Sequence, residues 1–188
     1  MDLKRIGQFC KKAKTIRIMY HPKSASLWIG NGKAMWLADE GIEINRKNCG
    51  ALLDVDDGDF EVAEGDTDLA YFDGNALYEN KDAADVLGCG MMGGKAFLAL
   101  NRGGECKVAL IPLEYAKAAT KEEDYRNYFL VGSEEYPVAA ITDGLNLKML
   151  VRIEGAGLTR EFIGMAQHIG EMEPFKDDTE DEQTQIQM

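Results

Sequence analysis

Glycines gather at Gly88, Gly90 and Gly93, a spacing that matches the G-x-G-x-x-G pattern of dinucleotide-binding sites. In those sites a strand precedes the glycines and a helix follows them, so that the helix N-terminus meets the pyrophosphate. Here the sequence predicts a short helix over 80–87 before the glycines and a strand over 95–101 after them. Because this order is reversed, we do not interpret the motif as a dinucleotide site.

Two other ligand motifs each fail at two required positions. A phosphate-binding P-loop ending at Gly94-Lys95 would need a glycine at position 89 and a serine or threonine at 96, where the chain has cysteine and alanine. A calcium loop starting at Asp54 would need its turn glycine at 59 and its bidentate glutamate at 65, where the chain has Asp59 and Gly65. The sequence therefore predicts no cofactor and no metal site, and for the nine acids of 54–73 it favours a solvated acidic loop over a looser cation site.

Cysteine and histidine residues form no catalytic or metal-binding pattern. The cysteines are far apart and include no C-x-x-C pair, so we expect reduced thiols and a cytoplasmic protein. No Ser-His-Asp or Cys-His arrangement can be argued, which leaves an enzyme open and favours a non-enzymatic protein. These residues are Cys10, Cys49, Cys89, Cys106, His21 and His168.

Basic side chains are concentrated at the start of the chain. Residues 2–14 are predicted to form a helix, because apolar residues from Leu3 to Ala13 follow the spacing of one buried stripe. The bases of this segment lie on the other face. A basic face of this kind is either an ordinary solvated surface or a surface for nucleic-acid phosphates. A second helix is predicted over 112–120, and it adds one lysine within it and one directly after it. The candidate nucleic-acid-binding residues are Lys4, Arg5, Lys11, Lys12, Lys117 and Lys121.

The formal net charge of −12 conceals a body that is close to neutral. Residues 54–73 hold nine acids and no base, a charge of −9, and residues 173–188 carry −5. These two segments together carry a charge of −14. Because the whole chain carries −12, the rest of the chain carries about +2. A basic face on that remainder is therefore compatible with an acidic protein.

The pattern of elements predicts an α+β fold with a mainly antiparallel sheet and helices packed on it. Asn31-Gly32 and Asp143-Gly144 each separate two apolar runs, which is a strong signal for a β-hairpin. No βαβ alternation is present. The strands are predicted over 15–21, 26–30, 33–39, 95–101, 106–111, 127–133, 136–142 and 145–154, with a further piece at 42–45 and a last helix over 158–172.

We expect a single domain over 1–172 and a disordered acidic tail over 173–188. The stretch 46–94 is predicted to be an acidic, irregular insertion in that domain. No apolar run approaches the roughly 20 residues that span a bilayer, so no membrane role is expected.

Two resemblances extend this interpretation. Cys10, Lys14 and the hairpin Trp28-Ile29-Gly30-Asn31-Gly32 resemble the opening of uncharacterised proteins from phages and integrative elements of Gram-positive gut bacteria, and 123–153 resembles their C-terminal part. The layout of two halves, each a helix followed by a meander, is similar to a domain of a DNA sliding clamp. In such clamps the helices carry Lys and Arg toward the duplex.

Two functions follow as expectations. The first is a clamp-like DNA-associated module, for processivity or regulation, whose partners are double-stranded DNA or a DNA-replication protein; a ring would require several copies of the chain or a partner. The second is a protein-interaction or regulatory domain that uses the acidic surfaces 54–73 and 173–188, with no nucleic-acid role.

Overall fold

The computed structural model describes residues 2–55, 60–73, 83–102, 108–119, 126–133 and 136–154. The predicted helix 158–172, the predicted tail 173–188 and Lys121 lie outside these ranges. In chain order the elements are α1 (Leu3–Ala13), β1 (Thr15–His21), β2 (Ser26–Gly30), β3 (Ala34–Leu37), α2 (Cys49–Leu52), β4 (Glu61–Asp66), the 3-10 helix η1 (Ala70–Phe72), β5 (Ala83–Met92), β6 (Lys95–Arg102), β7 (Val108–Pro112), α4 (Leu113–Ala119), β8 (Arg126–Gly132), β9 (Pro137–Asp143) and β10 (Asn146–Arg152).

One continuous sheet of ten strands organises the described part of the chain. Its order is β4-β1-β2-β3-β10-β9-β8-β5-β6-β7. Neighbouring strands pair antiparallel except β1 and β4, which pair parallel from Thr15↔Glu61 to Tyr20↔Asp66. This confirms the predicted mixture of helices with a mainly antiparallel sheet.

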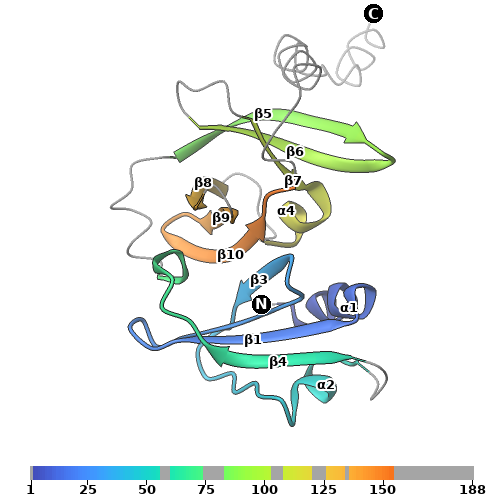
Figure 1. The fold of residues 1–188 in the computed structure, drawn as a ribbon, viewed down its shortest axis with the longest axis vertical. Helices are drawn as coiled ribbons and strands as arrows, with labels where there is room; N and C mark the ends of the chain where they lie inside the picture. Colours follow the sequence, from blue (N-terminus) through green and yellow to red (C-terminus); the bar gives the residue numbers. More distant parts are fainter. Residues whose placement is uncertain are drawn as a thin grey trace, which may run out of the picture.

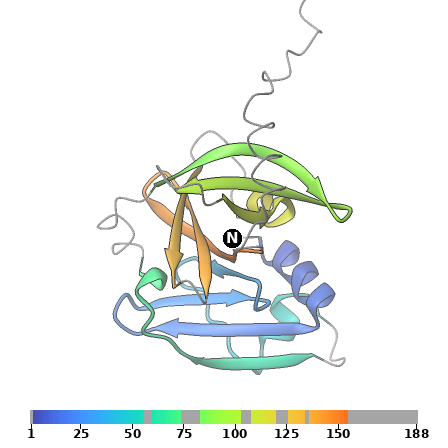
Figure 2. The ribbon, with the colours of Figure 1, turned by 45° about the horizontal axis from the view of Figure 1, so that its top comes forward.

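The sheet is built around two meanders that meet at its centre. The first meander is β1-β2-β3 and the second is β8-β9-β10. They join where β3 pairs with β10, with Met35 opposite Leu150 at the middle of the paired segment (Figure 1). Each meander follows a helix, α1 or α4. Figure 2 shows β1 and β4 at one end of the sheet and the β5–β6 hairpin at the other, with both helices between them.

Alternation along the strands divides the core into two faces. On one face, residues such as Ile16, Ile18 and Trp36 pack with side chains of α1 and α4 in the largest hydrophobic cluster. On the opposite face, Trp28 and Phe72 belong to a second cluster. Their rings pack edge to face, with the ring centroids 5.1 Å apart. Trp28 is 0% exposed and Trp36 is 4% exposed. Both tryptophans are therefore core residues and cannot stack with nucleobases from solution.

The predicted helix over 80–87 is wrong where the structure describes it. Residues from Ala83 onward belong to β5, which runs to Met92 and pairs along its length with β6. Gly93 and Gly94 form the turn, with φ of +55° and +75°, which glycine adopts without strain. The G-x-G-x-x-G spacing thus lies in a hairpin strand and its turn. The pairing with β6 overrides the helical preference of the alanines and leucine.

Regular structure also occurs within 46–94, a stretch that the sequence predicts to be irregular. Its described part contains α2, β4, η1 and β5, two of which are strands of the main sheet. The piece 42–45, in contrast, adds no strand to the sheet. Among the described residues, no helix is long and apolar enough to cross a membrane.

Gly7 allows α1 to lie directly against the chain that follows α2. A Cβ atom at this position would collide with the backbone carbonyl of Leu53. Gly7 and Leu53 are both buried, and Leu53 is 1% exposed. The glycine therefore costs helix propensity but permits a close approach of two backbones that a side chain would prevent.

We expect Gly7→Ala to destabilise the protein by about 2 kcal/mol, because the colliding atom is backbone and cannot rotate away. For a chain of this size the melting temperature should fall by about 4–8 °C in a thermal denaturation experiment. Gly65→Ala is the matched control, since a Cβ there has nothing within 4 Å. An unchanged melting temperature for Gly7→Ala would contradict the close approach.

Candidate nucleic-acid interface

Helix α1 presents its basic residues to solvent because its ends and its apolar face are fixed. The Asp2 carboxylate caps the helix by accepting a hydrogen bond from the Arg5 backbone N–H at 3.0 Å. Lys14 ends the helix with a left-handed conformation at φ +52°. Ile6 and Cys10 are buried at 2% and 0% exposure, as the predicted stripe requires.

The predicted basic residues of α1 are all exposed. They lie opposite the buried stripe. Lys11 and Lys12 are in the final helical turn, where a positive charge interacts favourably with the negative end of the helix dipole. Within the described part of the chain only one of them forms an ion pair. These exposed residues are Lys4, Arg5, Lys11 and Lys12, followed by Lys14 at the C-cap.

Helix α4 lies beside α1 on the same face of the sheet. The Phe9 and Tyr115 rings lie with their centroids 4.8 Å apart, and Trp36 lies under both, at 5.4 Å from Phe9 and 6.1 Å from Tyr115. The helix starts at Leu113, and Pro112, expected as its first residue, instead ends β7 opposite Phe97. The structure therefore brings together the two helices that the sequence singled out.

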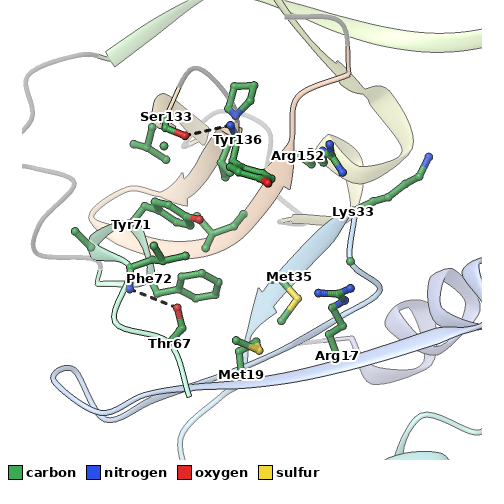
Figure 3. Close-up of a pocket in the computed structure, with 18 of the residues that line it drawn as sticks. Arg17, Met19, Lys33, Met35, Thr67, Tyr71, Phe72, Ser133, Tyr136 and Arg152 are labelled. Atoms are coloured by element: carbon green, nitrogen blue, oxygen red, sulfur yellow. Dashed lines mark hydrogen bonds between the residues drawn. The ribbon is translucent and has the colours of Figure 1, made fainter. Parts of the chain in front are cut away.

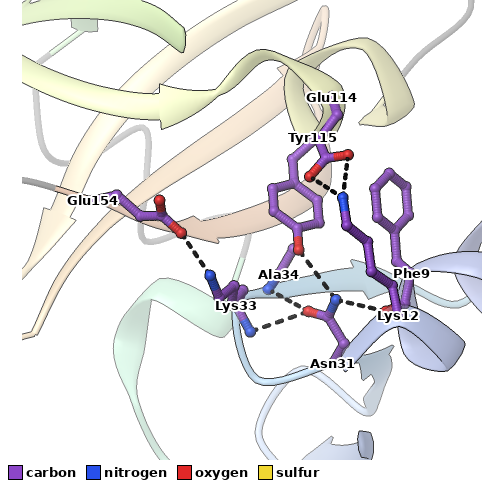
Figure 4. A network of polar contacts seen from close by, with 8 residues as sticks. All are labelled: Phe9, Lys12, Asn31, Lys33, Ala34, Glu114, Tyr115 and Glu154. Atoms are coloured by element: carbon purple, nitrogen blue, oxygen red, sulfur yellow. Dashed lines mark hydrogen bonds and ion pairs between the residues drawn. The ribbon is translucent and has the colours of Figure 1, made fainter. Parts of the chain in front are cut away.

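An ion pair joins the exposed sides of the two helices. Lys12 Nζ donates to Glu114 Oε2 at 3.1 Å and to Oε1 at 3.2 Å (Figure 4). The two side chains are 70% and 47% exposed, so the pair contributes little to stability. It does neutralise one of the predicted phosphate-binding residues. Lys117 is exposed on α4.

The combined surface of the two helices remains positive. We call it the helix face and define it as the exposed side chains of 2–14 and 113–119. It carries six cations against two acids, Asp2 and Glu114. In a protein of net charge −12, this face is a local exception that would attract a polyanion.

Asn31 fixes the relative position of the two helices and the β2–β3 turn. Its Nδ2 donates to the Phe9 carbonyl and to Tyr115 Oη, both at 3.2 Å, and its Oδ1 accepts from the backbone N–H groups of Lys33 at 3.1 Å and Ala34 at 3.0 Å (Figure 4). Asn31 is 5% exposed. Its amide therefore satisfies two acceptors and two donors in a buried position.

The sequence predicts this turn, but it does not predict the buried contacts of Asn31. The Asn31-Gly32 hairpin is confirmed, with Gly32 at φ +79°, although the connection from β2 to β3 spans three residues. Asn31 contacts Tyr115, which is 84 residues away in the chain. No local spacing indicates a contact of this kind, and an exposed-turn asparagine looks the same in sequence as a buried one.

Burial keeps the ionisable groups beneath the helix face neutral. Desolvation raises the pKa of the Cys10 thiol to about 12, with a smaller contribution from Cys49. Desolvation also raises the pKa of the Tyr115 hydroxyl above its ordinary value. Cys10 is consequently a thiol at neutral pH and lacks the thiolate character of a catalytic nucleophile.

The described residues offer no metal cluster of three or more His, Cys, Asp or Glu side chains. Within the described ranges one serine–histidine pair is present, between Ser24 Oγ and His21 Nδ1 at 2.6 Å. His21 Nε2 is buried without a hydrogen-bond partner in the described part of the chain, so no carboxylate orients the ring as a base. Ser24 Oγ also lies 2.8 Å from Ser26 Oγ, so the pair belongs to a local network in the β1–β2 turn.

Comparison of the chain with protein-family models, with curated proteins and with solved structures finds no match in any of the three.

We expect Asn31→Ala to lower the free energy of unfolding by at least about 2 kcal/mol, because it leaves several buried donors and acceptors without partners. Urea denaturation should show a lower midpoint with an unchanged slope. Tyr115→Phe, which removes only one hydroxyl, should cost about 1 kcal/mol. The exposed Asn127, whose amide reaches one carbonyl at 3.5 Å, supplies a control in Asn127→Ala. Equal midpoints for the Asn31 and Asn127 variants would show that Asn31 does not hold the helices.

Proposed function

We propose that this protein is a non-enzymatic, DNA-associated module that binds the phosphates of duplex DNA with its helix face. The observation that carries the proposal is the side-by-side position of α1 and α4 on one face of a continuous sheet, with cations outnumbering acids on their exposed sides. As part of the same proposal, the module serves replication or its regulation in a phage or mobile element.

The dimensions of the helix face suit contact with several phosphates. With 11 residues, α1 is about 16 Å long, and a B-form duplex carries about one negative charge per 1.7 Å of its axis. A helix of this length therefore lies within reach of many phosphates at once. Lys and Arg on its surface would neutralise phosphates without reading base edges, so the binding should be independent of DNA sequence.

The arrangement of the halves supports a clamp-like form of this proposal. α1 precedes β1-β2-β3 and α4 precedes β8-β9-β10, and the last strands of the two meanders, β3 and β10, pair in the centre. A domain with this layout can line a channel with its helices while its sheet faces outward. Closing a ring around DNA would require several copies or a partner protein.

The proposal predicts a weaker and less salt-sensitive interaction with DNA when the helix face loses charge. For a variant that combines Lys4→Ala, Arg5→Ala and Lys11→Ala, the slope of log affinity against log salt concentration should fall in magnitude by about 3, or about 0.9 for each lost phosphate contact. Fluorescence anisotropy with a labelled 20-base-pair duplex, measured over a salt series, provides the test.

Two further variants sharpen this measurement. A triple variant of Lys23, Lys47 and Lys95 to Ala removes the same charge from exposed positions outside both helices and should leave the slope unchanged. Glu114→Gln removes an acid from the helix face and frees Lys12, so it should strengthen binding. If the first triple variant keeps the wild-type affinity and slope, the helix face does not bind DNA.

The alternative function, interaction with a basic protein through acidic surfaces, has one observation in its favour. β4 is an edge strand of the sheet and carries Glu61, Glu64 and Asp66, all exposed. Charged residues on an edge strand also protect it from pairing with other chains, which is their ordinary role. A variant in which these three acids are changed to Gln or Asn distinguishes the functions. If the alternative holds, a pull-down from cell extract should lose the captured protein. If the helix face binds DNA, the same variant should still bind DNA.

A further inference from the structure

A groove of about 880 Å³ lies on the face of the sheet opposite the helix face. Strand alternation sets its floor: in β1, Ile16 and Ile18 point to the helix side, whereas Arg17 and Met19 line the groove. Met35 of β3 lines it in the same way (Figure 3). The groove therefore belongs to a surface that the proposed DNA contact does not use.

The groove has one cationic end and one apolar end. Figure 3 shows Arg17, Lys33 and Arg152 gathered on one side, with Tyr71 and Phe72 of the η1 segment on the other. Met35 and Phe72 are 9% and 7% exposed and belong to the second hydrophobic cluster. A ligand that fills the groove would thus meet an apolar wall and a group of positive charges together.

No carboxylate lines the groove among the described residues, although the protein as a whole is strongly acidic. Lys33 Nζ pairs with Glu154 Oε1 at 2.8 Å, and this hydrogen bond raises the pKa of the lysine. Arg17 and Arg152 form no ion pair within the described part of the chain. Two guanidinium groups are therefore open to an incoming anion.

The shape of the Arg17 end depends on Gly32. A Cβ atom at Gly32 would lie 3.1 Å from Arg17 Nε, so the guanidinium lies across the turn that links β2 and β3. This turn is the one that Asn31 fixes from the other side of the sheet. Hydrogen bonds to Asn31 thus hold the backbone of the turn beside Arg17, so this backbone needs no further ordering when a ligand binds.

We propose that this groove binds an extended peptide segment of a partner protein that carries carboxylate and apolar side chains. Guanidinium groups bind carboxylates in a planar, two-point geometry, and methionine-lined apolar surfaces adapt to side chains of different shape. A single strand of nucleic acid fits less well, because its phosphates need cations along the whole path, whereas here the cations lie at one end. The proposal is independent of DNA binding by the helix face.

Selection of random 12-residue peptides displayed on phage against the full-length protein tests this proposal. The selected peptides should combine Asp or Glu with aromatic or aliphatic residues. A synthetic peptide of the selected consensus should bind Arg17→Gln/Arg152→Gln protein about tenfold more weakly than the wild type, by fluorescence anisotropy. Tyr136→Ala, at a rim position 63% exposed, should also weaken binding.

Three controls make the result decisive. Arg46→Gln removes an exposed arginine outside the groove and should have no effect. The consensus peptide with Asn and Gln in place of its acids should bind no better to the wild type than to the double variant. Thermal denaturation confirms that the variants fold, as exposed substitutions should.

Selected peptides without acids, or a consensus peptide whose affinity is the same for wild type and double variant, would overturn the proposal. The same applies if selection yields no binder. If instead a labelled 12-nucleotide single strand binds in a manner that depends on Arg17 and Arg152 and displaces the peptide, the groove is a nucleic-acid site and the peptide assignment is wrong.

Discussion

The side-chain amide of Asn31 joins three parts of the chain that are distant in sequence: the C-terminal half of α1, the β2–β3 turn and the first turn of α4. An amide is suited to this position because it offers two donors and two acceptor sites, all of which are used here in a buried setting. Aspartate lacks the donors and leucine lacks both. The rings of Phe9, Trp36 and Tyr115 pack around this contact, so polar and apolar interactions hold the same junction.

The junction sets both candidate surfaces. On the side of the helices it places α1 beside α4, so that the basic residues of α1 and Lys117 of α4 lie on one positive face with an internal ion pair. On the other side it fixes the turn that supports Arg17, at the cationic end of the groove. Because the two surfaces lie on opposite faces of one sheet, the proposed DNA contact and the proposed peptide contact share no residue.

Much of the fold could be predicted because its signals are local. β1 and β2 have the predicted bounds, since alternation of apolar residues and the Asn-Gly turn both depend only on neighbouring positions. The helix expected before Gly88 failed because local preference was outweighed by pairing with β6. The close approach of Gly7 to Leu53 could not be predicted either, since it involves two backbone segments that are 46 residues apart in the sequence.

The candidate sites were predictable only in part. The exposed cations of α1 follow from helical periodicity, and their exposure agrees with it. The neutralisation of Lys12 by Glu114 and the buried role of Asn31 depend on how two helices meet. The groove could not be predicted at all, because its lining comes from strands of both meanders and from the chain around η1.

Hydrogen–deuterium exchange of the full-length protein, with and without a 20-base-pair duplex at low salt, measures whether DNA contacts the helix face. If it does, amide exchange in α1 and α4 should slow on addition of DNA, whereas exchange in the groove strands β1 and β10 should stay unchanged. Exchange that stays the same in both helices, or that slows only in segments lining the groove, would contradict this contact.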